Sequence, residues 1–379
     1  RGMLRVWNIS LLVATFSLTI LGTFLTRSGV LNSVHAFSES SIGSWFLALF
    51  AVVLVVSIGL IGWRGDKLRS PGVIDSPLSR EAAFLANNVL FAVFAFVVLL
   101  GTVFPLIIEA LQNRQIAVGA PFFDKLSMPI GLALLTLMAI APVLPWRKAS
   151  TETLRQRLFW PAWCGVTALV ASLLLGAYGL APLLTFTLGG VSAGAALRQV
   201  VLATRRQGWR GLVGRANGGM IVHLGVILIA VALGASNSFS KSQELSLVAN
   251  VEANFSGHTF ELKDVVEVRD DRSISVKALV LVDGKKIYAP AITKYTRIGM
   301  NVGTPSVRTS LTTDIYLTLE PPVRQDANEA RIKVFIKPMI IWLWIGTALM
   351  AVGTVLAAFP GRRRKPTDAT SAPVEVAAS

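Results

Sequence analysis

The sequence predicts an all-α polytopic membrane bundle of about eight transmembrane helices, joined to one extracytoplasmic β-rich domain. Hydrophobic residues make up 53% of the 379 residues, charged residues make up only 15%, and the mean hydropathy is +0.61. Several apolar runs come close to the length of about 20 residues that a helix needs to cross a bilayer. Residues 237–338 are mostly polar and contain stretches in which apolar and polar side chains alternate, as they do in strands.

The eight expected spans are separated by short loops. The fifth and sixth form a tight hairpin through Tyr178 and Gly179, and prolines in the fourth favour a tilt or kink. In chain order, the expected spans cover residues 7–25, 42–63, 85–108, 128–145, 161–178, 180–197, 217–236 and 339–359.

Basic residues in the short loops predict how the chain is oriented in a membrane, because cytoplasmic loops carry an excess of Lys and Arg. Nineteen of these residues fall on one side, and only Arg27, Arg114 and Lys125 fall on the other. We therefore expect a multi-pass membrane protein with both termini in the cytoplasm. The loops at 26–41 and 109–127 and the polar stretch at 237–338 would face outwards.

This reading divides the chain into four parts. Residues 1–236 form a seven-span region, 237–338 the outer β-rich domain, 339–359 the last span and 360–379 a basic, disordered cytoplasmic tail. Within the outer domain, strands at 274–282 and 286–295 are joined by Asp283 and Gly284, a hairpin signal. Further strands are expected at 312–320 and 330–338, in a small barrel or sandwich packed on the membrane bundle.

Composition argues against two other classes of protein. The formal charge of +15 could suggest a nucleic-acid partner, but the positive residues lie in short loops between apolar runs, so no nucleic acid is expected. The single cysteine, Cys164, excludes a disulfide or a thiolate metal site built within this chain.

His223 is the one ionisable residue of the seventh expected span. Counted from the cytoplasmic side, it lies roughly 8–10 Å deep. Ionisable residues in spans often mark functional sites, and neutral imidazole is a common axial ligand of haem iron. The alternative is a packed histidine bonded to a neighbouring helix. A haem with two histidine ligands would need a second membrane histidine, which this chain lacks.

His35 lies on the opposite side, in the loop that follows Arg27. A hydrocarbon core of about 30 Å separates the two faces, so His35 and His223 cannot bind one metal ion. Arg27 could pair with a haem propionate while His35 reaches the iron. The alternatives are a solvated loop histidine and a simple interfacial arginine. His258, in the outer domain, is expected to be structural or to lie at the surface.

At these residues the chain resembles the CcmF/NrfE family of cytochrome c-type biogenesis proteins. The matching stretches run in order along essentially the whole chain. They are ILGTFLTRSGVLNSVHAF (20–37), LANNVLFAVFAFVVLLGTVFPLIIEAL (85–111), VGAPFFD (118–124), GGMIVHLGV (218–226), KIYAPAITKYTRIGMNVGTPSVRTSLTTDIYLTLE (286–320) and IKPMIIWLWIGTALMAVG (336–353).

The resemblance implies a subunit of a cytochrome c haem lyase, of the holocytochrome c synthase type, that joins haem to the CxxCH cysteines of apocytochrome c. His35 would present a transient haem substrate that a haem chaperone delivers. His223 would be one of two histidines that hold a stable haem b. Further partners would be apocytochrome c, CcmH-type maturation subunits and membrane lipid.

The chain departs from the family pattern in three ways. It lacks the tryptophan-rich WWD segment, a first outer histidine and the partner membrane histidine, all of which would precede Arg1. We therefore expect a C-terminal portion of a longer protein, inactive by itself. Two other readings stay open: a transporter or permease, and a structural membrane subunit without haem.

Overall fold

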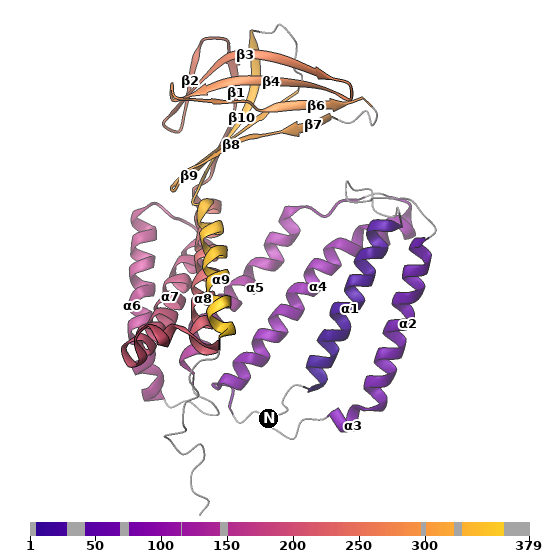
Figure 1. The fold of residues 1–379 in the computed structure, drawn as a ribbon, viewed down its shortest axis with the longest axis vertical. Coiled ribbons are helices and arrows are strands. Elements are labelled where there is room, and N and C mark those ends of the chain that lie inside the picture. The colour runs from indigo at the N-terminus through magenta and orange to yellow at the C-terminus, as the bar shows by residue number, and fades with distance from the viewer. Residues whose placement is uncertain are drawn as a thin grey trace, which may run out of the picture. The chain divides into compact units, whose positions relative to one another are not determined.

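The computed structural model describes residues 5–28, 42–68, 76–114, 116–144, 151–296, 301–321 and 328–359 (Figure 1). It confirms the predicted class, a helical membrane bundle with a β-rich domain. The chain divides into two compact units, Arg1–Gly131 with Pro145–Ala149 and Leu132–Leu144 with Ser150–Ser379.

The first unit is built from long apolar helices. Ser79 caps the longest of them, since its hydroxyl accepts a hydrogen bond from the Ala82 N–H, and Asn113 ends it in a left-handed conformation at φ 49°. A Cβ at Gly101 would lie 2.6 Å from the Phe123 ring, so this glycine allows close packing of the next helix. The unit contains α1 (Arg5–Arg27), α2 (Ile42–Trp63), α3 (Gly65–Leu68), α4 (Arg80–Gln112) and the first half of α5 (Ala120–Ile140).

The helices of the second unit pack more tightly. Ser192 is fully buried, and its hydroxyl donates to the Leu135 carbonyl at 3.0 Å, which ties the end of α5 to α7. The expected hairpin after the fifth span is present, with Gly176 and Gly179 at positive φ. The helices are η1 (Ala141–Val143), α6 (Thr151–Leu174), α7 (Leu180–Gln207), η2 (Gly208–Leu212), α8 (Arg215–Phe239) and α9 (Ile341–Ala358).

Helices α8 and α9 lie side by side (Figure 1) and approach each other through glycines. A Cβ at Gly225 would lie 2.6 Å from the Gly346 carbonyl oxygen, and one at Gly353 would lie 2.6 Å from the Val222 nitrogen. Neither position could hold a larger residue without moving backbone. Small residues of this kind let membrane helices pack by van der Waals contact where the hydrophobic effect gives no drive.

Eight of the described helices are long and apolar enough to cross a membrane. Many of their large apolar side chains face outwards; Leu12, Val55 and Trp344 are 72%, 72% and 70% exposed. Such surfaces suit lipid rather than water. The chain is therefore a multi-pass membrane protein.

The β-rich domain folds as two antiparallel sheets that share one core. The four-stranded sheet has the order β1-β10-β9-β8, and the six-stranded sheet has the order β2-β3-β4-β6-β7 with β5 paired to β4. The strands are β1 (Lys241–Val248), β2 (Glu252–Phe255), β3 (His258–Asp270), β4 (Ser273–Val282), β5 (Lys286–Tyr288), β6 (Ala291–Tyr295), β7 (Asn301–Thr304), β8 (Ser306–Thr309), β9 (Thr313–Leu319) and β10 (Glu329–Pro338).

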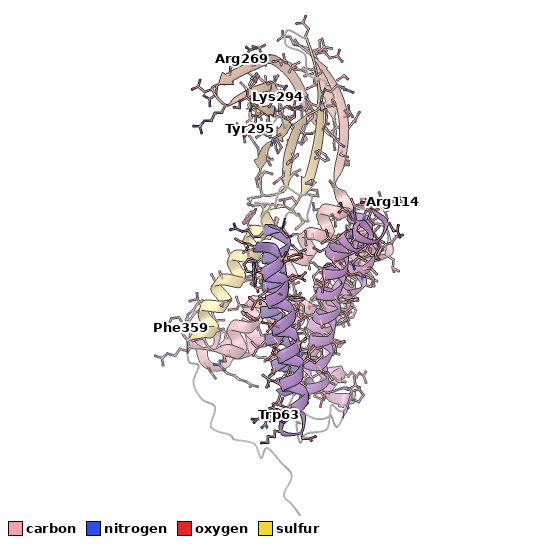
Figure 2. The ribbon with its side chains drawn as sticks, turned by 90° about the vertical axis from the view of Figure 1, so that its right-hand side faces the viewer. Trp63, Arg114, Arg269, Lys294, Tyr295 and Phe359 are labelled. Carbon is pink, nitrogen blue, oxygen red and sulfur yellow. The ribbon has the colours of Figure 1, made fainter. Side chains whose placement is uncertain are left out.

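Alternating side chains from both sheets fill the core of this domain. Leu247 and Ile332 come from one sheet and Phe260 and Val280 from the other, and at most 1% of each is exposed. At one end of the larger sheet, Arg269 of β3 and Lys294 of β6 lie near one another (Figure 2). Both residues pair with Ile274 of β4, which runs between their strands.

One expected strand is interrupted. Residues 286–295 were expected to form a single strand, but the ladder breaks between β5 and β6 at Ala289 and Pro290. Proline has no N–H to donate to a ladder, so a central strand cannot run through it. The Pro290 carbonyl still accepts a hydrogen bond from the Ala278 N–H at 3.0 Å, which keeps the segment against β4.

Candidate functional site

His223 lies on α8, in the third turn of a helix that begins at Arg215. Its Nδ1 atom is buried, and no residue in the described part of the chain gives it a hydrogen-bond partner. Buried polar atoms in proteins nearly always have such a partner. Inside a bilayer, water cannot supply the missing bond either, so this nitrogen needs an explanation.

The two packed faces of α8 do not include His223. Gly218, Val222 and Gly225 face α9, where a Cβ on either glycine would meet α9 backbone. Ile227 lies in the apolar cluster that α8 shares with α7 and the end of α5, and Met220, Leu224 and Val231 pack around that cluster. With 3.6 residues per turn, His223 falls between these two faces.

The space beside His223 is open at Gly219, one turn earlier on the same side of the helix. A Cβ built at Gly219 would meet no atom of the described residues within 4 Å, in contrast with its neighbour Gly218, which lies against Ala357 of α9. The helix therefore carries a partly buried imidazole next to a position without a side chain. The surroundings are apolar, with Val226 and Ala230 further along this side.

The end of α8 nearest His223 is held in place by backbone contacts and carries positive charge. Asn217 donates from its side-chain amide to the Gly211 carbonyl, and the Gly214 N–H donates to the Leu356 carbonyl at 3.0 Å. Arg210 in η2 and Arg215 at the start of α8 are both exposed. Anionic groups near this end of the helix would meet these side chains and the positive end of the helix dipole.

This arrangement fits an axial ligand better than a complete metal site. The described residues contain no group of three or more His, Cys, Asp or Glu side chains close enough to hold a bare metal ion. A porphyrin supplies four nitrogen ligands of its own, so that a haem needs only one or two from the protein. The imidazole of His223, whose Nδ1 has no hydrogen-bond partner among the described residues, can serve as one of them.

The predicted outer site is only partly described. Arg27 is the last residue of α1 and is exposed. His35 belongs to the segment 29–41, which lies outside the described residues. The position of His35 relative to Arg27 therefore stays a prediction.

His258 takes part in a hydrogen-bonded pair that the sequence did not reveal. Its Nδ1 lies 2.8 Å from Oδ2 of Asp283, and Oδ1 of Asp283 accepts a hydrogen bond from the Thr259 N–H at 3.0 Å. Burial alone would raise the pKa of the Asp283 carboxyl, but the hydrogen bonds with His258 and Thr259 outweigh it and the net pKa is lowered. Asp283 was recognised only as a hairpin turn; nothing in the sequence tied it to a histidine 25 positions earlier.

Comparison with known proteins gives the chain its relatives. It is 31% identical over 374 residues to the cytochrome c-type biogenesis protein CcmF of Pseudomonas aeruginosa, and the match covers 96% of this chain. The corresponding protein of Escherichia coli is 31% identical over 376 residues. A solved structure described as the cytochrome c heme lyase CcmF superposes with a TM-score of 0.75 at 27% identity, over 95% of this chain. The chain is homologous to CcmF.

Two facts qualify the match with CcmF. The chain spans 56% of the Pseudomonas aeruginosa CcmF and 56% of the chain in the solved CcmF structure. No family model matches the chain.

A probable cytochrome c-type biogenesis protein NrfE of Escherichia coli is also similar to the chain, at 25% identity over 96% of this chain.

Proposed function

We propose that this chain works in cytochrome c maturation, where it holds a haem b through His223 and presents a second haem for attachment to apocytochrome c. The observation that carries the proposal is the buried Nδ1 of His223, which has no partner among the described residues. The names of the CcmF relatives support the same process.

His223 is the proposed axial ligand of the resident haem. Its imidazole sits on a helix that α7 and α9 hold from two sides, so the ring reaches a haem with little reorganisation. When bound, this haem supplies a redox-active iron that could keep the incoming haem ferrous. The second histidine ligand would come from outside this chain.

His35 is the proposed ligand of the transient haem substrate, with Arg27 pairing with a propionate. The role of His35 is to orient the substrate iron while the haem vinyl groups meet the two cysteine thiols of the CxxCH motif. Because the thiols come from apocytochrome c, no nucleophile is required from this chain. The proposed role is therefore that of a lyase subunit.

The proposed setting is the bacterial inner membrane, with residues 237–338 on the outer side where apocytochrome c arrives. The distribution of Lys and Arg supports this orientation. A haem chaperone and CcmH-type subunits are the proposed further partners, and the β domain offers a folded surface on that side.

Two variants test the proposal in the protein purified from the membranes of its own host. His223→Ala should remove a b-type Soret band. His35→Ala should abolish maturation of c-type cytochromes, measured by haem staining of cell extracts, and leave that band in place. A wild-type protein without a b-type band would refute the role of His223, and normal maturation in His35→Ala would refute the role of His35.

A further inference from the structure

The three glycines around His223 have different surroundings. Gly218 and Gly225 are explained by helix packing, because any side chain there would collide with α9. Gly219 is not explained in this way, since a Cβ there meets nothing within 4 Å in the part of the chain that the structure describes. A glycine inside a helix lowers stability by about 1 kcal/mol relative to alanine. Because helix packing does not require a glycine at position 219, its presence there needs another explanation.

The charge on α8 is confined to one residue near its start. Arg215 is the only charged residue between the start of this helix and its end at Phe239, and it is exposed. It lies eight residues before His223, a rise of about 12 Å, and eight residues turn the helix through about 80° beyond two full turns. Arg215, Gly219 and His223 therefore follow one side of α8 at a spacing of four residues.

We infer that these three residues form a haem slot along α8, in which Gly219 admits the porphyrin face and Arg215 binds a propionate. The inference rests on the proposed function, since it assumes that His223 ligates haem. The helix rise of about 12 Å from His223 to Arg215 is a distance that a propionate and the long arginine side chain would span together. The guanidinium is well suited to a carboxylate, with which it can form two parallel hydrogen bonds.

The slot explains why a glycine stands where packing does not require one. A flat macrocycle lying along the helix needs a surface without projecting side chains, and Gly219 provides it on the turn between the two polar residues. The partial positive charge at the start of α8 would act on the propionate in the same direction as Arg215. Both residues are positioning groups for a haem that His223 binds.

The steric part is tested with Gly219→Leu, because the open space lets this variant fold. Ala230→Leu is the matched control, since it enlarges a residue on the same side of α8 seven positions after His223. Both proteins are purified from membranes, and their visible spectra and thermal unfolding are recorded. We expect Gly219→Leu to lose the b-type band and to melt at the temperature of the haem-free His223→Ala protein, since a bound haem itself stabilises the fold. Ala230→Leu should keep the band.

The charge part is tested with Arg215→Gln, with Arg215→Lys as the conservative variant and Arg210→Gln as the control on a nearby exposed arginine. Loss of a charged hydrogen bond should raise the haem dissociation constant roughly 10- to 100-fold, measured by transfer to apomyoglobin. The midpoint potential should fall, because removing a positive charge favours ferric iron. Arg215→Lys should recover part of both effects, and Arg210→Gln should show neither.

The outcomes separate this inference from the proposed function. If His223→Ala removes the band while Gly219→Leu and Arg215→Gln keep wild-type spectra, haem affinity and potential, the slot is wrong and the ligand stands. If the wild-type protein has no b-type band, both are wrong. If Gly219→Leu fails to fold, the haem affinity of Arg215→Gln decides alone.

Discussion

At the residue scale, the imidazole of His223 brings a polar nitrogen into the apolar middle of α8. The sequence located this residue because an ionisable group inside an apolar run is rare and costly. It could not show that Nδ1 is buried with no partner among the described residues, or that none of these residues fills the space at Gly219. Both facts depend on which sides of α8 its neighbours cover, and a single sequence does not contain that information.

A second residue-scale prediction concerns His258 and Asp283 in the β-rich domain. The pKa of Asp283 is lowered, so the contact stabilises the fold above the ordinary value of 3.8 and is lost as the pH falls through the lowered pKa. Asp283→Ala should therefore unfold at a lower temperature than the wild type near pH 6, and the difference should shrink in acid. Thermal unfolding from about pH 6 to about pH 3 measures it. A difference that stays constant over this range would contradict the assignment.

At the element scale, the helices and strands were predicted well where the signal is periodic. The expected ranges found all eight long helices, although polar ends such as the Ser79 cap of α4 lie outside the apolar pattern. The sequence left open whether the outer domain is a barrel or a sandwich, because strand order depends on contacts between distant residues. Pro290 is itself a signal for a break in the strand, because it has no N–H to donate to the ladder, but the expected strand at 286–295 ran through it.

The close crossing of α8 and α9 gives an element-scale prediction. Gly353→Leu places a side chain against the Val222 nitrogen, where a Cβ would already lie 2.6 Å away, so the helices must separate. We expect a loss of about 1–3 kcal/mol in the free energy of unfolding, as for other overpacked contacts. Unfolding in detergent with increasing denaturant measures it.

Gly59→Leu on α2 is the matched control for that variant. A Cβ at Gly59 meets nothing within 4 Å, so the same substitution has room there. Equal destabilisation by Gly353→Leu and Gly59→Leu would show that the crossing is not the cause.

At the scale of the whole molecule, charge and hydropathy predicted the membrane class, and the structure confirms it. The division at Gly131 into two compact units was not expected, because it falls inside the helix α5 rather than at a loop. A boundary of that kind reflects which helices share contacts, and no composition change marks it. The orientation in the membrane stays a prediction from the positive residues.

That orientation can be measured by cysteine labelling in intact cells. Cys164 is replaced by Ser, and a single cysteine is introduced at exposed Lys285 or exposed Arg210. A membrane-impermeant maleimide should label Lys285→Cys from outside and Arg210→Cys only after the membrane is opened. Labelling of Arg210→Cys in intact cells would contradict the proposed orientation of the chain in the membrane.

The central claim, that His223 ligates a haem, is tested most directly by chemical rescue in the whole protein. His223→Gly removes the imidazole and leaves space at its position, so imidazole added to the solution can take its place on the iron. We predict that His223→Gly lacks the b-type Soret band and that imidazole restores it, while an equal concentration of a non-coordinating base does not. A b-type band that persists in His223→Gly without imidazole would contradict the claim.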